Sequence, residues 1–459
     1  MNPAAAIVLV LCAAGLLRTQ SPAREGQDDG IVQSVRAMAA GVSSDSLGHS
    51  VRTLSAFETR HTLSDPDPAG RGIGAARAWV EQELRAVAQQ SGGRLVVSLQ
   101  TAKVACARPG MPREVEVTNV LATLRGTVDP DRAYVVSGHY DSRNANGSDA
   151  SGPAPGANDD ASGTAVVLEA CRVMARHSFP ATIVFAAYDG EEHGLLGSQA
   201  HAEALAAAGV RVDGMVTCDI VGNTMGMDGV RRDRHVRCFS YAPTGNDSTG
   251  RSLARVVASS AVRHARADDP FAVQLVWRGD RYGRGGDHKS FFDRGFPAVR
   301  LTEPREDFSR QHQDVVVKDG RAHGDIADAI DTEYMRRVTM LAVATLAELA
   351  TAPPAPVVLS AEGARDRYDT KVIVQLPEGA TRFELVWRET TAPDWSHVVS
   401  MEGAAATKDE RGRYVATLRG VCIDDVVVGA RTVADGGARS RAAAAPEPDR
   451  FQQRRDGVR

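Results

Sequence analysis

The stretch ATIVFAAYDGEEHGLLGS, from Ala181 to Ser198, joins a continuous apolar run to an acidic turn. A short apolar run without alternation is typical of a strand buried on both faces of a parallel sheet. Glu191, Glu192 and His193 follow it closely. Acidic residues are also favoured in the first turn of a helix, where free N–H groups and the helix dipole attract negative charge. The glutamate pair alone therefore fits a helix start as well as a functional site, and partners elsewhere in the chain must decide.

Apolar runs alternate with helical patterns on both sides of this stretch, between about residues 94 and 350. The alternation predicts an α/β domain whose mixed, mostly parallel sheet is flanked by helices. Strands are predicted at 94–100, 119–126, 133–139, 181–189, 214–222, 271–277 and 296–303, and helices at 72–88, 162–177, 250–265 and 333–349. The stretch from residue 24 to about residue 35 is polar and carries no predicted element. This domain accordingly spans residues 24–350.

The pattern changes at the proline-rich linker TAPPAP, residues 351–356, because proline cannot continue a helix. Beyond it, short runs such as TRFELVWRE alternate apolar and polar side chains without helices between them. Such runs predict an all-β sandwich over residues 357–440, with Phe383 and Leu385 on one face. This block resembles a fibronectin type III domain. The polar tail, residues 441–459, is predicted to be disordered.

The N-terminus reads MNPAAAIVLVLCAAGLLRTQSPA, and its apolar run is too short to span a bilayer comfortably. It is typical of a secretory signal peptide over residues 1–23, with an uncleaved anchor as the alternative. We therefore expect a secreted or periplasmic protein without stable membrane insertion after signal cleavage. The 459-residue chain has a net charge of -4 and no basic stripe, which argues against a nucleic-acid partner. Its 6 cysteines include no C-x-x-C pair, which argues against a disulfide framework and a cysteine-type zinc site.

Acidic and imidazole side chains follow several of the predicted strands, at the point where each strand ends. A glycine-rich loop, PGANDDASG, adds two aspartates just before a predicted helix. Ligands of open α/β sheets bind at the carboxyl ends of the strands, so these side chains are expected at one edge. They are His139, Asp159, Asp160, Glu191, Glu192, Asp219 and His312.

Each of these residues has a structural alternative when it is taken alone. A lone histidine after a strand is usually a surface or core residue, Asp159 and Asp160 fit helix N-caps, and Asp219 fits a turn. These alternatives do not explain why two histidines and several carboxylates fall on one edge. A pair of divalent cations needs imidazole nitrogens, carboxylate oxygens and one bridging carboxylate. Without thiolates in the set, zinc is favoured, and manganese and cobalt are alternatives.

The motifs GHYDS, PGANDDASG, YDGEEHGLLGS, CDIVGN, GGDH and QHQD together resemble the co-catalytic zinc peptidase family. That family includes bacterial leucyl aminopeptidases, glutamate carboxypeptidase and the glutaminyl cyclases. The resemblance covers roughly residues 40–350, with a catalytic core from about residue 116. It implies a zinc exopeptidase fold that holds two zinc ions.

The resemblance also implies a role for each residue of the set. Glu191 would not bind metal but would act as the general base, and Asp141 would hold the imidazole of His139. Asp287 matches a supporting position, and the peptide bond between Asp159 and Asp160 is expected to be cis. The implied ligands are Asp159 bridging both zinc ions, His139 and Asp219 on one, and Glu192 and His312 on the other.

Three features of the sequence leave alternatives open. The family's last histidine usually lies in a His-Thr motif followed by an aspartate, whereas here Gln313 and Asp314 follow His312. This leaves the second partner of His312 unassigned, with His193 and His288 as alternative ligands. Tyr282 and Arg284 lie just before the motif GGDH and are candidates for stabilising the oxyanion that forms at the scissile carbonyl. The segment LSAFETRHTLS, with Arg60 and His61, fits either a pocket wall or a loop at a helix end.

The function implied is that of a secreted zinc-dependent aminopeptidase, which hydrolyses N-terminal peptide bonds through a hydroxide bridging two zinc ions. Its partner would be a peptide or small amide substrate. A carboxypeptidase, a dipeptidase or a glutaminyl cyclase would use the same ligands and is the first alternative. A catalytically dead binding protein is the second alternative. The β-sandwich would then contact a surface or another protein, a role that it could also play in the enzyme.

Overall fold

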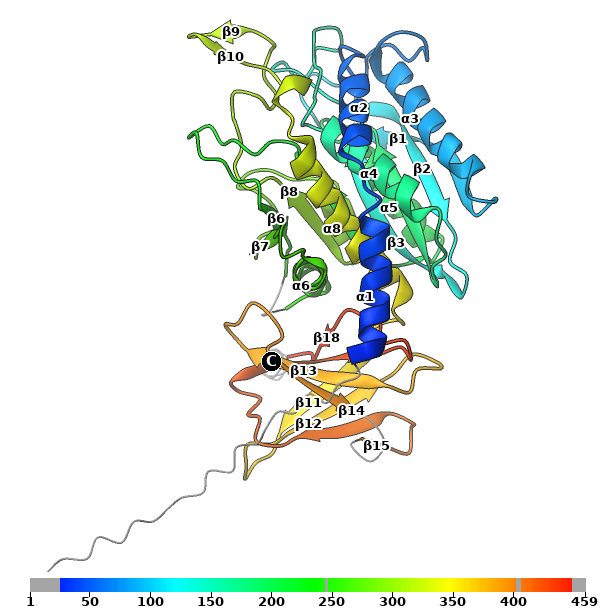
Figure 1. Ribbon diagram of the computed structural model, residues 1–459, viewed down its shortest axis with the longest axis vertical. Helices are drawn as coiled ribbons and strands as arrows, with labels where there is room; N and C mark the ends of the chain where they lie inside the picture. The colour runs from blue at the N-terminus through cyan, green and yellow to red at the C-terminus, as the bar shows by residue number, and fades with distance from the viewer. Residues whose placement is uncertain (1–24, 244–246, 402–405, 448–459) are drawn as a thin grey trace, which may run out of the picture.

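The structure is a computed structural model that describes residues 25–243, 247–401 and 406–447. An α/β domain forms one end of the molecule and an all-β domain the other (Figure 1). The predicted signal peptide, residues 1–23, lies outside the described residues, so the signal and secretion stay predictions. Among the helices that the structure describes, none is long and apolar enough to cross a membrane.

The elements of the α/β domain follow the predicted alternation, with additions. The helices are α1 (Glu25–Ala39), α2 (Ser44–Ser55), α3 (Gly72–Gln89), α4 (Ala161–Met174), α5 (Leu196–Ala207), α6 (Thr249–His264), α7 (His288–Phe292) and α8 (Thr332–Thr351), with a short 3-10 helix at Ala327–Ala329. The strands are β1 (Leu95–Ala105), β2 (Glu114–Leu124), β3 (Asp129–His139), β4 (Ala181–Tyr188), β5 (Arg211–Cys218), β6 (His235–Phe239), β7 (Ala272–Val276), β8 (Ala298–Thr302), β9 (Val317–Lys318) and β10 (Arg321–Ala322).

Helix α1 occupies a stretch that the sequence presents only as polar. Its C-terminal part contributes Val35, Met38 and Ala39 to the main hydrophobic core. These side chains pack against α8, which is distant in the sequence. Tertiary packing of a few apolar residues therefore stabilises a helix that local composition does not indicate.

Eight strands form one mixed sheet in the order β1-β2-β4-β3-β5-β8-β6-β7. The central pairs β4–β3, β3–β5 and β5–β8 are parallel, as is β6–β7. The pairs β1–β2, β2–β4 and β8–β6 are antiparallel. The predicted α/β fold with a mixed, mostly parallel sheet is thus confirmed. Because the central strands run in one direction, β3, β4, β5 and β8 all end at the same edge.

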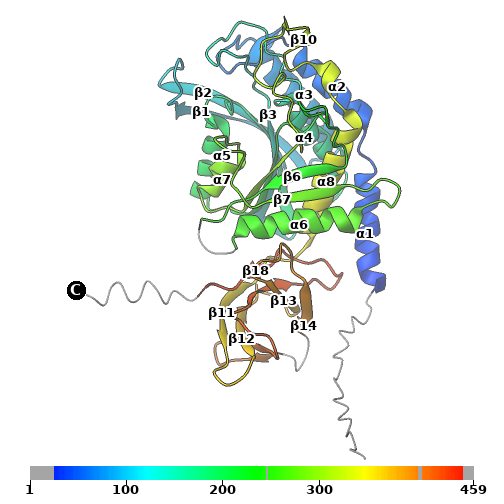
Figure 2. The ribbon, with the colours of Figure 1, turned by 90° about the vertical axis from the view of Figure 1, so that its left-hand side faces the viewer.

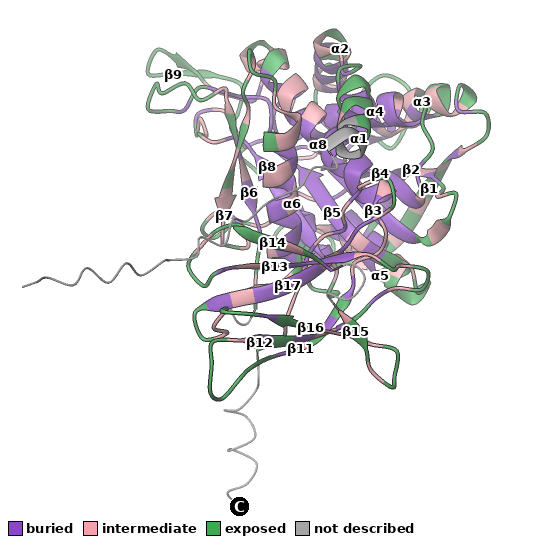
Figure 3. Ribbon diagram, turned by 60° about the horizontal axis from the view of Figure 1, so that its bottom comes forward, coloured by how far each residue is buried: buried purple, intermediate pink, exposed green. Residues whose placement is uncertain are grey.

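Helices cover both faces of this sheet (Figure 2). Helices α5 and α7 lie on one face, and α1, α2, α3, α4, α6 and α8 lie on the other. All eight residues of β4 are buried, with Phe185 in the larger core and Tyr188 in the smaller one. The central strands form the buried layer in Figure 3. Two covered faces explain why the run ATIVFAA carries no polar alternation.

The C-terminal domain is an all-β sandwich, as predicted. Its sheets have the orders β11-β12-β16-β15 and β14-β13-β17-β18. Phe383 and Leu385 are buried in the core between the sheets, on the predicted face. The fibronectin type III assignment stays a prediction. The strands are β11 (Val357–Gly363), β12 (Thr370–Gln375), β13 (Phe383–Glu389), β14 (His397–Met401), β15 (Thr407–Lys408), β16 (Tyr414–Leu418), β17 (Val426–Thr432) and β18 (Ala443–Ala444).

The sandwich extends past residue 440, so the predicted start of a disordered tail at residue 441 is wrong. Strand β18 pairs with β17, with Ala444 opposite Gly429. Ala442 is buried. Backbone pairing with β17 holds this alanine-rich segment in the sheet. Residues 448–459 lie outside the described part of the chain.

The sandwich docks on α6 through a buried arginine. Arg255 forms an ion pair with Asp247 at 2.8 Å, and its Nε donates to the carbonyl of Pro393 at 2.8 Å. The Arg255 guanidinium lies 4.9 Å from the ring centre of Trp277 in the α/β domain and 5.6 Å from that of Trp395 in the sandwich. A desolvated cation over an indole ring is favourable, so this cluster stabilises the contact between the two domains.

Candidate active site

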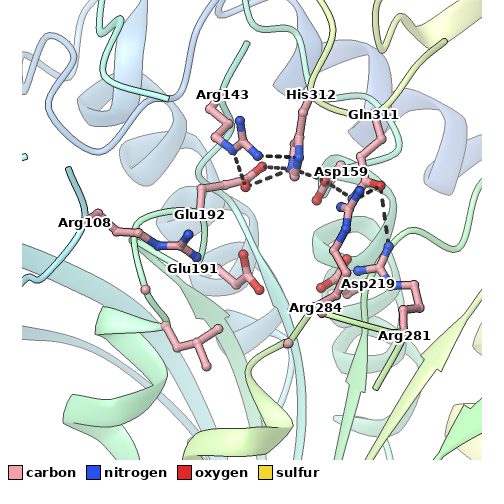
Figure 4. A pocket seen from close by; sticks show the side chains of 14 residues that line it. Arg108, Arg143, Asp159, Glu191, Glu192, Asp219, Arg281, Arg284, Gln311 and His312 are labelled. Atoms are coloured by element: carbon pink, nitrogen blue, oxygen red, sulfur yellow. Dashed lines mark hydrogen bonds and ion pairs between the residues drawn. The ribbon is translucent and has the colours of Figure 1, made fainter. Parts of the chain in front are cut away.

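The residues singled out in the sequence converge at one edge of the sheet (Figure 4). His139 is the last residue of β3, and Asp219 directly follows β5. Glu191 and Glu192 lie in the turn between β4 and α5, and His312 lies in the loop after β8. A cavity of about 410 Å³ opens at this edge. The residues of the set that line the cavity are Asp159, Glu191, Glu192, Asp219 and His312.

The carboxylate of Asp159 lies between two imidazoles. Its Oδ1 is 3.2 Å from Nε2 of His139, and its Oδ2 is 2.8 Å from Nε2 of His312. The backbone N–H of Asp159 donates to Asp325 at 2.7 Å, which holds the loop in place. The peptide bond between Asp159 and Asp160 is cis, as the resemblance implied. Asp159 is thus placed to bridge two cations.

Asp160 has a structural role that differs from the role of Asp159. Its Oδ1 accepts from the N–H of Gly163 at 2.8 Å, which makes Asp160 the N-cap of α4. Its Oδ2 accepts from the N–H of His139 at 3.1 Å, and Oδ1 also accepts from Ile220 at 3.3 Å. Although Asp160 lies within reach of His139 and Asp219, backbone donors occupy its oxygens. The N-cap alternative therefore holds for Asp160 and not for Asp159.

Glu192 and His312 form the second half of the site with Asp159. Nε2 of His312 is 2.9 Å from Oε2 of Glu192. Burial opposes the charged imidazole, but the carboxylates of Glu192 and Asp159 outweigh it and raise the pKa of His312 to about 9. Two carboxylates that stabilise a proton on one imidazole form a strongly negative cluster, and such a cluster favours a cation.

The second partner of His312 is Arg143 and not a carboxylate. Nη2 of Arg143 lies within hydrogen-bond distance of Nδ1 of His312, and Nε of Arg143 donates to Glu192 at 3.0 Å. Asp314, the aspartate that follows in sequence, accepts instead from the N–H of Ala145 at 3.3 Å. The side chain of Arg143 thus neutralises part of the charge on Glu192 and orients the imidazole.

Glu191 faces the cavity without belonging to either cluster of candidate ligands. Its Oε2 is 3.9 Å from Nε2 of His139, and its side chain is 12% exposed. Burial raises the pKa of Glu191 well above its usual value. Helix α5 begins only at Leu196, so both glutamates precede the helix. The alternative that they serve as acidic residues of a first helical turn is therefore wrong.

Asp141 lies beneath both halves of the site. Its Oδ1 is 3.3 Å from Nδ1 of His139, and both side chains are fully buried. The N–H groups of Glu191 and Glu192 each donate to the Asp141 carboxylate at 3.2 Å. One carboxylate thereby orients an imidazole and the glutamate turn together, as expected of the group behind a ligating histidine.

The two alternative ligands, His193 and His288, lie outside the candidate metal clusters of the described residues. His193 is buried behind the turn, with its Nε2 2.9 Å from Nε2 of His61. His288 bonds the carbonyl of Gly279 at 2.7 Å. Asp287, the expected supporting residue, is buried at the start of α7, and burial raises its pKa to about 7.

Arg60 and His61 do not line the cavity, so the pocket-wall alternative is wrong. Arg60 is fully buried and donates to the carbonyls of Tyr140 at 2.6 Å and Gly156 at 2.9 Å. These carbonyls flank the loop that carries Asp159. Arg60 therefore supports the site from behind, because its donors satisfy the carbonyls of an irregular buried loop.

Several residues of the site were not predicted. Arg300 is fully buried, and its Nη2 lies 2.9 Å from Oδ1 of Asp219. The sequence could have indicated this residue, because an arginine inside the apolar run FPAVRLTE is expected to be buried and a buried charge needs an acidic partner. Gln311 donates to Asp159 at 2.7 Å, and Asp325 accepts from the same residue's backbone. The last two lie in irregular loops and gave no local signal.

The oxyanion candidates differ in position. The side chain of Tyr282 is 90% exposed and does not line the cavity. Arg284 does line it, together with Arg108, Arg143 and Arg281. Arg284 therefore remains the candidate of the two for contacting substrate.

The donor atoms fit a pair of metal ions. Ligand atoms on one tetrahedral zinc lie roughly 3.3 Å apart, given bonds of about 2.0 Å. Here His139 is 3.2 Å from Asp159 and 3.9 Å from Asp219, and His312 is 2.8–2.9 Å from Asp159 and Glu192. Nε2 of His139 is buried and has no hydrogen-bond partner among the described residues. Imidazole and carboxylate donors without thiolates suit zinc.

Comparison with known proteins agrees with this geometry. Residues 119–345 match the sequence pattern of Peptidase family M28. A probable zinc metalloprotease of Pyrenophora teres f. teres is 37% identical over 89% of this chain and 86% of its own length. The LapA aminopeptidase of Legionella pneumophila shares the fold, with a TM-score of 0.51, 22% identity and coverage of 70% and 75%. Macrostomum lignano glutaminyl cyclase matches with a TM-score of 0.50, 16% identity and coverage of 71% and 93%.

The family match and the curated relative, together with the donor atoms at this edge, identify a zinc metalloprotease. The chain belongs to peptidase family M28, which confirms the resemblance drawn from its motifs.

Proposed function

We propose that this chain is a secreted, zinc-dependent aminopeptidase that uses two zinc ions. The observation that carries the proposal is the carboxylate of Asp159, which faces His139 at 3.2 Å and His312 at 2.8 Å while Glu191 remains unligated beside them. His139, Asp159 and Asp219 would hold one zinc ion, and Asp159, Glu192 and His312 the other. When bound, zinc supplies a Lewis acid that polarises the scissile carbonyl and lowers the pKa of water.

Glu191 is the general base of this proposal. A carboxylate that takes a proton from water and returns it to a leaving amine works best when its pKa lies near the working pH. Burial raises the pKa of Glu191, which moves it in that direction. The backbone of Glu191 is anchored on Asp141 by its own N–H, so its carboxylate faces the cavity from a fixed turn. In this role, Asp141 positions the base and the imidazole of His139.

The relatives favour peptide hydrolysis over the other chemistries of the family. The Pyrenophora relative, which aligns along most of both chains, is described as a metalloprotease. The LapA structure is that of an aminopeptidase, and its likeness to this chain concerns the fold. A binding protein without activity has no need of an unligated, buried glutamate beside a metal cluster, and Glu191 therefore supports an active enzyme.

The test uses the purified protein loaded with zinc, on matched peptides with free and acetylated N-termini. We expect stepwise loss of N-terminal residues from the free peptides only, stopped by a chelator and followed by mass spectrometry. Cleavage of acetylated peptides from the C-terminus would replace the aminopeptidase with a carboxypeptidase. Cyclisation of N-terminal glutamine without hydrolysis would replace it with a cyclase.

A further inference from the structure

The cavity over the candidate metal site is lined by four arginines and four carboxylates. Its wall includes Arg108, Arg143, Arg281 and Arg284. The carboxylates in the wall are Asp159, Glu191, Glu192 and Asp219. Three of these carboxylates are the proposed zinc ligands and the fourth is the proposed base. The proposed zinc ligands therefore account for three of the four negative charges in the wall.

Two of the four arginines are already neutralised by acidic partners. Arg143 pairs with Glu192 at 3.0 Å. Arg281 pairs with Asp280 at 3.3 Å and with Glu306 at 3.0 Å. These two arginines serve to hold the wall together, and neither offers an uncompensated charge to a substrate.

Arg108 and Arg284 have no acidic partner among the described residues. Arg108 comes from the segment between β1 and β2, and its side chain passes over Gly194 of the glutamate turn. Arg284 comes from the loop before α7 and donates to the amide oxygen of Gln311 at 3.2 Å. Both are exposed. In Figure 4, Arg108 enters beside Glu191 and Arg284 beside Asp219, so they flank the reaction centre.

Arginines also line a second cavity, on the side of the first that leads away from the candidate metal site. A second cavity of about 650 Å³ shares Arg281 and Arg284 with the first. Arg278 also lines it, over the ring of Tyr282 and without an acidic partner among the described residues. The one acidic residue in its wall, Glu306, is paired with Arg281 and with Arg237, at 3.0 and 2.7 Å. A peptide that leaves the metal site on this side thus passes another uncompensated cation.

We propose that the site selects peptides that carry a carboxylate next to the scissile bond, bound by Arg108 and Arg284. The planar guanidinium matches a carboxylate with paired donors, and it keeps its charge at all working pH values. The carboxylate can come from an acidic side chain at the first or second residue, or from the free C-terminus of a dipeptide. This specificity rests on the proposed peptidase function.

The experiment compares kcat/KM for the zinc-loaded enzyme on isosteric pairs. One parent peptide carries Glu or Gln at its first residue, and a second carries them at its second residue. A dipeptide is supplied with a free or an amidated C-terminus. A hydrogen bond to a charged group corresponds to about a tenfold to hundredfold preference for the carboxylate form in at least one pair. Which pair shows it identifies the source of the carboxylate.

Variants assign the preference to residues. Arg108→Gln and Arg284→Gln should each reduce the Glu/Gln ratio toward one, and Arg284→Lys should restore part of it. Arg85→Gln, at an exposed arginine of α3 paired with Glu81, is the matched control and should leave the ratio unchanged. High salt should also lower the ratio, because the two arginines are exposed.

The outcomes separate this proposal from the proposed function. Equal turnover of every matched pair, or a preference for lysine peptides, overturns the carboxylate specificity and leaves the peptidase standing. A preference that survives both glutamine variants overturns the assignment to these arginines. Failure to hydrolyse any peptide overturns the proposed function itself, and the specificity falls with it.

Discussion

Glu191 and Glu192 should show different effects on kcat and on zinc affinity when each is changed to glutamine. Glu191→Gln keeps the shape of a side chain that lies outside the candidate ligand clusters. We expect it to leave zinc binding nearly unchanged and to lower kcat by about 10²- to 10⁴-fold, the usual contribution of a general base. At 1.36 kcal/mol per tenfold, this is roughly 3–5 kcal/mol of transition-state stabilisation.

Glu192→Gln should produce the opposite pattern. Oε2 of Glu192 is 2.9 Å from His312 and 3.0 Å from Arg143, and an amide nitrogen there would face donors instead of pairing with them. We expect zinc affinity to fall by at least about 100-fold, since even groups behind the ligands change it by 10–100-fold. Activity should then recover in part at high zinc concentration.

The assay measures bound zinc per protein by elemental mass spectrometry at a fixed free zinc concentration, beside kcat on one good peptide. Folding of each variant is checked by its thermal unfolding midpoint under the same conditions. If Glu191→Gln lost its zinc while Glu192→Gln kept it, the two roles would be reversed. Wild-type activity in Glu191→Gln would show that the reaction needs no base at this position.

Three further changes test the supporting structure. Asp141→Asn should weaken zinc binding by about 10–100-fold, measured by titration against a competing chelator. Asp131→Asn, exposed near the other end of β3, is its control, and equal effects of the two would remove the special role of Asp141. Chelation should lower the free energy of unfolding, by about 2.7 kcal/mol relative to zinc at 100 times Kd, and a denaturation midpoint that ignores zinc would contradict the metal site. His201 tests the core: burial lowers its pKa to about 4, so the unfolded chain binds an extra proton between pH 4 and about 6.5. Stability from this residue is full above pH 6.5 and lost on acidification toward pH 4, roughly 3 kcal/mol in all. Urea midpoints of metal-free His201→Gln should vary less with pH than those of the wild type, and parallel curves would refute the assignment.

Sequence alone located the edge of the sheet that carries the site. Continuous apolar runs such as ATIVFAA indicate strands that are buried on both faces of the sheet. Once such a run is recognised, the residues that follow it are placed at the carboxyl end of the strand. His139, Glu192 and Asp219 were placed in this way, and the structure brings them to one edge of the sheet. The family resemblance then gave roles that strand ends alone do not distinguish.

The rest depended on contacts between distant segments. Asp159 and Asp160 both fit an N-cap in the sequence, and the bond from the N–H of Gly163 shows that Asp160 is the cap. The second partner of His312, which the sequence left unassigned, is Arg143, from a loop far away along the chain. Such pairings have no local periodicity, and no pattern of spacing predicts them.

The position of Arg255 between Trp277 and Trp395 limits how the C-terminal domain of this chain can be exchanged for another. Trp277 also lines the second cavity, so the wall of that cavity rests on a cation that the sandwich helps to enclose. Cutting the chain after α8 would expose this cation and both faces of the stack to water. The sandwich is thus part of the catalytic unit's architecture. A foreign C-terminal domain would have to reproduce an aromatic ring and a carbonyl acceptor at the same place.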